Sequence, residues 1–87
     1  MRIKKILVEK EVQEKIFKKH NVNRDDIESV FFDEPIFYRT RDNRYMAIGD
    51  NNITIIFAYE KGTAKVITAY FASKWQKRLY KVKKCRK

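Results

Sequence analysis

The chain has 87 residues, which is enough for one small domain and too few for two. Hydrophobic residues make up 44% of it and only two Gly and one Pro interrupt the pattern, which argues against a wholly disordered chain. A single Cys excludes an internal disulfide framework and a multi-cysteine zinc site, and no apolar stretch approaches the roughly 18 residues of a membrane span. We expect one domain over residues 1–87, in the cytoplasm and without a membrane partner.

The N-terminal third is predicted to contain two helices. Arg2–Val8 fits either a short edge strand or the start of a helix, and its periodicity leaves both open. Apolar residues at helical spacing predict a helix over Glu9–Lys19. Asn23 is a typical N-cap followed by acids, and the second helix should end near Phe32, because Pro35 restricts the residue before it.

The middle of the chain is predicted to be a β-sheet. Four segments are rich in β-branched and aromatic residues: Ile36–Arg41, Arg44–Gly49, Ile53–Tyr59 and Thr63–Phe71. Short sets of turn-forming residues separate them, and connections this short make neighbouring strands antiparallel. We therefore expect a four-stranded meander with helices on one face, which is an α+β domain.

The last segment, Ala72–Lys83, is predicted to be an amphipathic basic helix. Its apolar side should pack on the sheet through Trp75 and Leu79. The cations on the opposite arc are Lys74, Lys77, Arg78, Lys81 and Lys84. We expect Lys84–Lys87 to be a frayed end in which Cys85 has no role.

Positive charge is concentrated in this last segment. The net charge is +10, and eight of the 21 Lys and Arg residues follow Ser73, where there is no Asp or Glu. The first 72 residues therefore hold 13 positive and 11 negative residues. This asymmetry favours a polyanionic partner, nucleic acid before a membrane surface. The alternative is a solvated, Lys-rich end that binds nothing in particular.

The common catalytic constellations are missing, and no metal or cofactor is expected. A single His excludes a His pair, and neither metal-ligand spacing nor a Gly-rich phosphate loop is present. Cations and phenols are left as candidates. They are Arg39, Arg41 and Arg44 in the first hairpin, with alternation placing Arg39 and Arg41 on one face; Tyr70, Lys74 and Tyr80 around the last strand and helix; and His20 between the first two helices.

This set suits the chemistry of RNA cleavage by a 2′-OH group. The reaction needs a proton acceptor, a cation near the phosphorus and a proton donor for the 5′-oxygen. We assign the catalytic positions to His20, Arg44, Tyr70 and Lys74, with Arg78 helping to hold the phosphate. Each has a plainer alternative: His20 is a surface or capping residue, and the hairpin arginines are a solvated edge that discourages aggregation.

Three stretches of the chain follow the order and spacing of motifs in a known toxin family. They are KKHNVNRDDIESVFFDEP, RYMAIG at Arg44–Gly49, and FAYEKGTAKVITAYFASKWQKRLY at Phe57–Tyr80. These stretches resemble motifs of the BrnT-type toxins over about residues 16–80. Two positions depart from the third motif, since Tyr70 stands where the family has an arginine and Gln76 where it has a glutamate.

The resemblance implies a small RelE-like α+β endoribonuclease that acts on RNA and pairs with an antitoxin protein. It places Lys19, His20, Arg44, Lys61 and Tyr80 at motif positions. From the basic surface and the resemblance together, the residues expected to bind nucleic acid are Lys19, Arg39, Arg41, Lys61, Lys77, Arg78, Tyr80 and Lys81. The first hypothesis is therefore a metal-independent endoribonuclease toxin. The alternative is a non-catalytic module of the same fold that binds nucleic acid or a protein partner.

Overall fold

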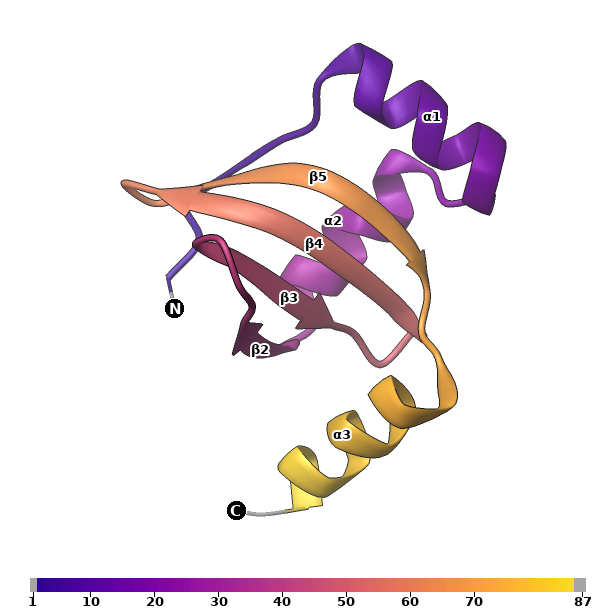
Figure 1. The fold of residues 1–87 in the computed structure, drawn as a ribbon, viewed down its shortest axis with the longest axis vertical. Helices are drawn as coiled ribbons and strands as arrows, with labels where there is room; N and C mark the ends of the chain where they lie inside the picture. The colour runs from indigo at the N-terminus through magenta and orange to yellow at the C-terminus, as the bar shows by residue number, and fades with distance from the viewer. Residues whose placement is uncertain (1, 86–87) are drawn as a thin grey trace.

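Residues 2–85 of the chain are described by a computed structural model, and within them eight elements follow one another (Figure 1). In chain order they are β1 (Lys5–Leu7), α1 (Lys10–His20), α2 (Arg24–Phe32), β2 (Ile36–Arg39), β3 (Arg44–Ile48), β4 (Ile53–Glu60), β5 (Thr63–Phe71) and α3 (Lys74–Cys85). The α+β class is confirmed, and the predicted strands are correct to within two residues at each end.

The sheet has the strand order β1-β5-β4-β3-β2. The predicted meander is present as β2 to β5, each antiparallel to the next. A further strand, β1, pairs in parallel with β5, so the predicted number of strands was one too small. The backbone N–H groups of Lys4 and Lys5 donate to the Gly62 carbonyl at 2.7 and 3.1 Å and fix the start of β1. This pairing partner is almost 60 residues away in the sequence, which explains why local periodicity left Arg2–Val8 open.

The helices α1 and α2 cover one face of the sheet (Figure 1), with α1 against β5 and α2 against β3 and β4. The main core lies in this layer, and its largest members are Val8, Ile16, Val22, Ile27, Val30, Ile53, Ile55, Phe57 and Val66. None of the helices in residues 2–85 is long and apolar enough to cross a membrane.

Two local features set how α2 meets the sheet. The Asn23 side chain accepts from the Asp26 backbone N–H at 2.9 Å, and Asp26 accepts in return from the Asn23 N–H at 3.1 Å, so the predicted N-cap is confirmed as a capping box. At the end of β3, a Cβ on Gly49 would lie 3.0 Å from Val30 Cγ2. Only glycine allows α2 to approach the strand this closely.

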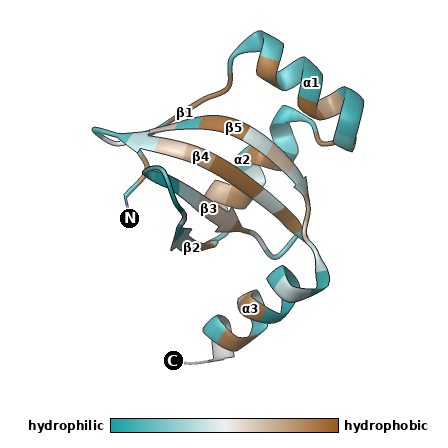
Figure 2. Ribbon diagram, viewed as in Figure 1, coloured by the Kyte–Doolittle hydropathy of each residue, from teal (hydrophilic) through white to brown (hydrophobic). Residues whose placement is uncertain are grey.

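The third helix, α3, packs on the opposite face at the end of the sheet formed by β2 and β3. Apolar and charged positions alternate along it (Figure 2). Leu79 and Tyr80 pack on the sheet as partly buried residues, and Gln76 is almost completely buried. Trp75 is 56% exposed, so the prediction that it anchors the helix is wrong. Gln76 instead faces the sheet, because its amide bonds with buried Thr54 at the sheet surface.

The bounds of α3 also differ from those predicted. It begins at Lys74 and continues to Cys85, so Lys84 belongs to the helix and not to a frayed end. Residues 86–87, the remainder of that predicted end, lie outside the described residues. Lys83 Nζ lies 4.7 Å from the centroid of the Tyr38 ring, a cation–π contact that joins the helix to β2.

An irregularity in β5 controls which of its side chains share a face. Phe57 pairs with Val66 but its neighbour Ile56 pairs with Thr68, so Ile67 is an extra, unpaired residue. Because of this bulge, Lys65 and Tyr70 lie on the same face of the sheet although their sequence separation is odd. The face is the one opposite α1 and α2, where α3 covers only one end.

Candidate active site and basic surface

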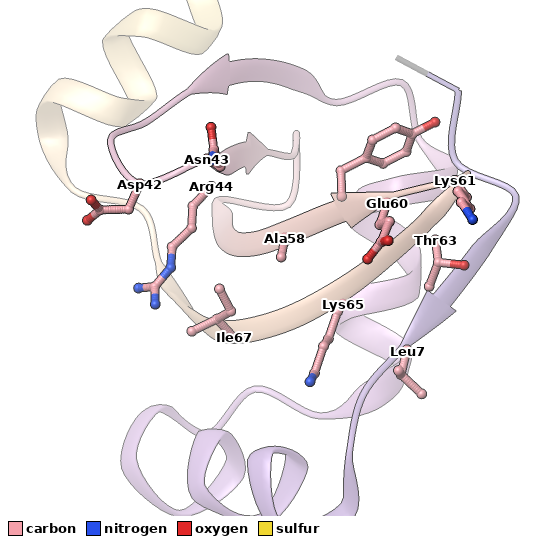
Figure 3. A pocket seen from close by; sticks show the side chains of 11 residues that line it. Leu7, Asp42, Asn43, Arg44, Ala58, Glu60, Lys61, Thr63, Lys65 and Ile67 are labelled. Carbon is pink, nitrogen blue, oxygen red and sulfur yellow. The ribbon is translucent and has the colours of Figure 1, made fainter.

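The uncovered part of this face, next to β1, forms a broad hollow of about 770 Å³ that we call the open-face hollow. Its charged residues come from four places: Asp42 in the turn before β3, Arg44 on β3, Glu60 and Lys61 at the end of β4, and Lys65 on β5. Arg44, Ile67 and Lys65 project from the same side of the strands (Figure 3). Two of the predicted residues, Arg44 and Lys61, are therefore brought together on one surface.

A second hollow of about 230 Å³ lies where α1 meets β5, and we call it the edge hollow. The end of α1 contributes Lys15, Lys19 and His20, and β5 contributes Ile67 and Thr68. Ile67 lines both hollows, so they adjoin across the bulge. The two predicted residues Lys19 and His20 thus continue the cationic surface that begins at Arg44.

His20 lies beside Tyr70. Their ring centroids are 6.1 Å apart and the rings are tilted by 53°. Nothing in the sequence places them together, because they are 50 residues apart and belong to different elements. Helix α1 packs against β5, and the ring at its last residue reaches the end of that strand. The structure therefore brings the two predicted proton-transfer residues together.

The Tyr70 phenol is also held by Gln76, which is 1% exposed. Gln76 Nε2 donates to the Tyr70 oxygen at 3.0 Å and also contacts Met46 Sδ at 3.4 Å. Gln76 Oε1 accepts from the Thr54 hydroxyl at 3.0 Å and from the Ser73 backbone N–H at 2.9 Å. The phenol is thus placed by a side chain that has three further partners of its own.

Arg44 does not share the immediate surroundings of Tyr70. It pairs with Ala58 on β4 whereas Tyr70 pairs with Thr54, so the two lie four residues apart along β4, or about 13 Å. They also lie on opposite sides of that strand. Lys74 is exposed at the start of α3, beyond the end of the strand that carries Tyr70. Of the four predicted catalytic residues, only His20 and Tyr70 are shown in contact within the described part of the chain.

The predicted hairpin arginines are dispersed. Phe37 and Arg39 are two residues apart on β2 and lie on the same face of the sheet, where Phe37 packs in the core beneath α2. The register of β2 and β3 places Arg44 on the opposite face. Arg39 Nη2 donates to Asn43 Oδ1 at 2.9 Å. Arg41 lies in the turn beyond the end of β2, so the alternation that was expected to align it with Arg39 does not extend that far.

The predicted binding residues on α3 also lie in different surroundings. Lys77, Arg78 and Lys81 are exposed, and Lys77 and Lys81 line a hollow of about 360 Å³ with Asp50 and Tyr80. The pKa of Tyr80 is raised by burial and, to a lesser extent, by the carboxylates of Asp50, Asp33 and Glu34. Tyr80 therefore packs near acids, which is a poor position for contacting phosphate.

Two residues of the site were missed from the sequence. Lys65 lines the open-face hollow and pairs with Glu9 at 3.0 Å, and the period of β5 could have placed it on the face of Tyr70 had the bulge been known. Gln76 could have been found from the Ser-x-x-Gln spacing of a capping box, since its backbone N–H also donates to Ser73 Oγ at 3.4 Å.

Metal ligands do not cluster in the described part of the chain, where no three His, Cys, Asp or Glu side chains come together as a metal site would require.

Comparisons with known proteins bear on the fold of the chain. No protein-family model matches the chain, and no curated protein matches its sequence. Among solved structures, the chain is similar to the crystal structure of the ribonuclease toxin BrnT from Brucella abortus, with a TM-score of 0.66 and 26% sequence identity. The match covers 80% of this chain and 97% of that one. The resemblance inferred from the motifs is confirmed: the chain is a structural relative of the BrnT-type toxins.

Proposed function

We propose that this protein is the toxin of a toxin–antitoxin pair and that it cleaves RNA in the cytoplasm without a metal ion. The observation that supports this most directly is the position of His20 beside Tyr70, at the edge of a cationic surface. An imidazole and a phenol this close can contact the same phosphodiester group. The fold that holds them is similar to that of a ribonuclease toxin.

In the proposed reaction His20 accepts the proton of the 2′-OH group while the 2′-oxygen attacks phosphorus. The P–O5′ bond breaks as the P–O2′ bond forms, which leaves a 2′,3′-cyclic phosphate and a 5′-hydroxyl. Tyr70 donates its proton to the departing 5′-oxygen, and solvent returns a proton to Tyr70 and removes one from His20. Lys19 and Lys74 supply positive charge near the pentavalent phosphorus. Cations at this position stabilise the negative charge that develops in the transition state.

The RNA on either side of the cleaved bond would follow the cationic surface. Arg44, Lys61 and Lys65 bind phosphates in the open-face hollow, and the exposed Lys77, Arg78 and Lys81 extend the surface along α3. Phosphate contacts of this kind carry little sequence information. We therefore infer that these contacts contribute to the affinity for RNA and to its position, and that the bond is cleaved at the edge hollow.

The direct test is incubation of the purified protein with total RNA in EDTA. Cleavage that leaves 2′,3′-cyclic phosphate ends, and that disappears in His20→Asn but not in the matched surface variant Lys18→Gln, is the expected result. RNA that stays intact at protein concentrations well above any contaminating nuclease would contradict the proposal.

The antitoxin would bind an apolar and cationic surface on α3. Trp75 and Val82 are exposed by 56% and 51%, and exposed cations lie between them with no acid after Glu60. Such a surface suits a partner segment that is both apolar and acidic. Co-expression with a small acidic protein encoded next to this one tests the assignment: Trp75→Ala should abolish co-purification, while Phe17→Ala, an equally exposed aromatic on α1, should not.

A second candidate function is a binding module without catalysis. It is favoured by the replacement of the family's arginine with Tyr70, which removes a cation from the centre of the site. This version predicts RNA binding that weakens steeply with salt and gives no cleavage products. RNA affinity that does not change between low and high salt would exclude it.

A further inference from the structure

The two departures from the family motif lie in direct contact. Tyr70 and Gln76 are joined by the 3.0 Å hydrogen bond between the phenol oxygen and Gln76 Nε2. The resemblance has an arginine and a glutamate at these positions, which are a donor and an acceptor of opposite charge. Here both partners are neutral, and the residue on the helix has changed from one that only accepts to one that donates.

The orientation of the Gln76 amide follows from its other partners. The Ser73 backbone N–H can only donate, and it lies 2.9 Å from Gln76 Oε1. The amide oxygen must therefore face Ser73, and the amide nitrogen must face Tyr70. The capping box at the start of α3 thus fixes which end of the amide the phenol meets.

This orientation decides the direction of the phenol proton. The Tyr70 oxygen accepts from the amide, so its own hydrogen is directed away from Gln76. The imidazole of His20, whose centroid lies 6.1 Å from that of the Tyr70 ring, lines the edge hollow. The phenol proton is consequently available to a group bound there.

We propose that Tyr70 and Gln76 form one neutral unit in place of the motif's arginine and glutamate, in which Gln76 is a positioning residue that keeps the Tyr70 proton directed outward. The unit explains why both departures occur together. A glutamate at position 76 would accept the phenol proton and turn it inward, away from the substrate. An arginine at position 70 would meet the donating amide of Gln76 and leave its charge without an acceptor.

One test uses RNA cleavage and rests on the proposed function. Gln76→Glu keeps the capping acceptor and the size of the side chain but reverses the bond to the phenol. We expect kcat to fall roughly ten- to a hundredfold with KM within about twofold, because binding is unaffected and the proton donor is misdirected. Tyr70→Phe should lose as much, and the double variant no more than either. Unchanged kcat in Gln76→Glu, or losses that multiply in the double variant, would overturn the proposal.

The other test needs no activity and so separates this inference from the proposed function. Thermal unfolding is measured for Tyr70→Arg, Gln76→Glu and the double variant, with Lys81→Gln as an exposed control on the same helix. We expect Tyr70→Arg to lower Tm by roughly 5–10 °C, and the double variant to unfold within about 3 °C of the wild type. Recovery in the double variant supports the unit even if Tyr70→Arg alone does not fold. Tm losses that add, or a double variant that does not fold, would overturn it.

Discussion

The edge hollow and the open-face hollow adjoin at Ile67 and both carry cations, yet they are built differently. At the edge hollow, the neighbouring Tyr70 is held by Gln76, and Gln76 is held by three further groups. In the open-face hollow, Arg44 makes no side-chain hydrogen bond or ion pair within the described residues, and the ion pair of Lys65 is exposed. One region fixes side chains, whereas the other only gathers charge.

This difference matters because attraction and catalysis need different degrees of order. A phosphate is attracted by a cation over several ångströms, and a long side chain can follow it. A proton donor must meet its acceptor at hydrogen-bond distance, and a misplacement of about 1 Å can cost two orders of magnitude in rate. We therefore expect changes at the edge to alter rate, and changes in the open-face hollow to alter affinity.

The largest effect should come from His20. His20→Asn removes the proton acceptor while keeping a polar side chain, and cleavage should fall about 100- to 10,000-fold. RNA affinity, measured by filter binding, should change less than about threefold. A variant that keeps its rate but loses binding would make His20 a contact for RNA and erase the contrast between the two regions.

Arg44 and Lys65 should show the opposite pattern. Each change to Gln removes one phosphate contact, so RNA affinity should weaken about three- to tenfold and the slope of log K against log salt should fall by roughly one. The rate at saturating RNA should be preserved. Arg39→Gln, on the other face of the sheet, is the matched control, and an equal loss there would show that net charge alone matters.

Thr54 offers a smaller test of the order at the edge. Thr54→Val keeps the shape of a fully buried side chain but removes the hydroxyl that bonds Gln76 Oε1. Stability should fall by about 1 kcal/mol, or roughly 4–8 °C in Tm. Thr63→Val, which has no such bond in the described structure, should be close to neutral. Equal losses in the two variants would mean that β-sheet packing and not the Gln76 amide is being measured.

The smallest effect should be the pH dependence due to Tyr80. Its pKa is raised above the ordinary value of 10.0, so the folded state favours the protonated phenol. This contribution to stability is present below pH 10 and is lost as the pH rises through the higher folded pKa. Between pH 8 and 11 the wild type should therefore lose more unfolding free energy in urea titrations than Tyr80→Phe does. The reverse order would contradict the burial of Tyr80 and the nearby acids as causes of its raised pKa.

Some parts of the site could be predicted from the sequence because they depend on neighbours within a few residues. The cap at Asn23, the strand Thr63–Phe71 and the exposed cations of α3 follow from local spacing, and each is present. Trp75 shows the limit of this reasoning. An aromatic residue at helical spacing was expected to pack on the sheet, but the amide of Gln76 takes that side because buried Thr54 requires a partner.

The sequence by itself determined the α+β class, the order of its main elements and the likeness to BrnT-type toxins, since local periodicity and motif spacing carry all three. Tertiary structure decided which charged and phenolic residues meet. The bulge at Ile67 put Lys65 on the face of Tyr70, and the packing of α1 on β5 put His20 beside it. The register of the strands also separated Arg44 from Tyr70 by four residues along β4. These distances arise from strand register and helix docking, which depend on contacts between residues far apart in the chain.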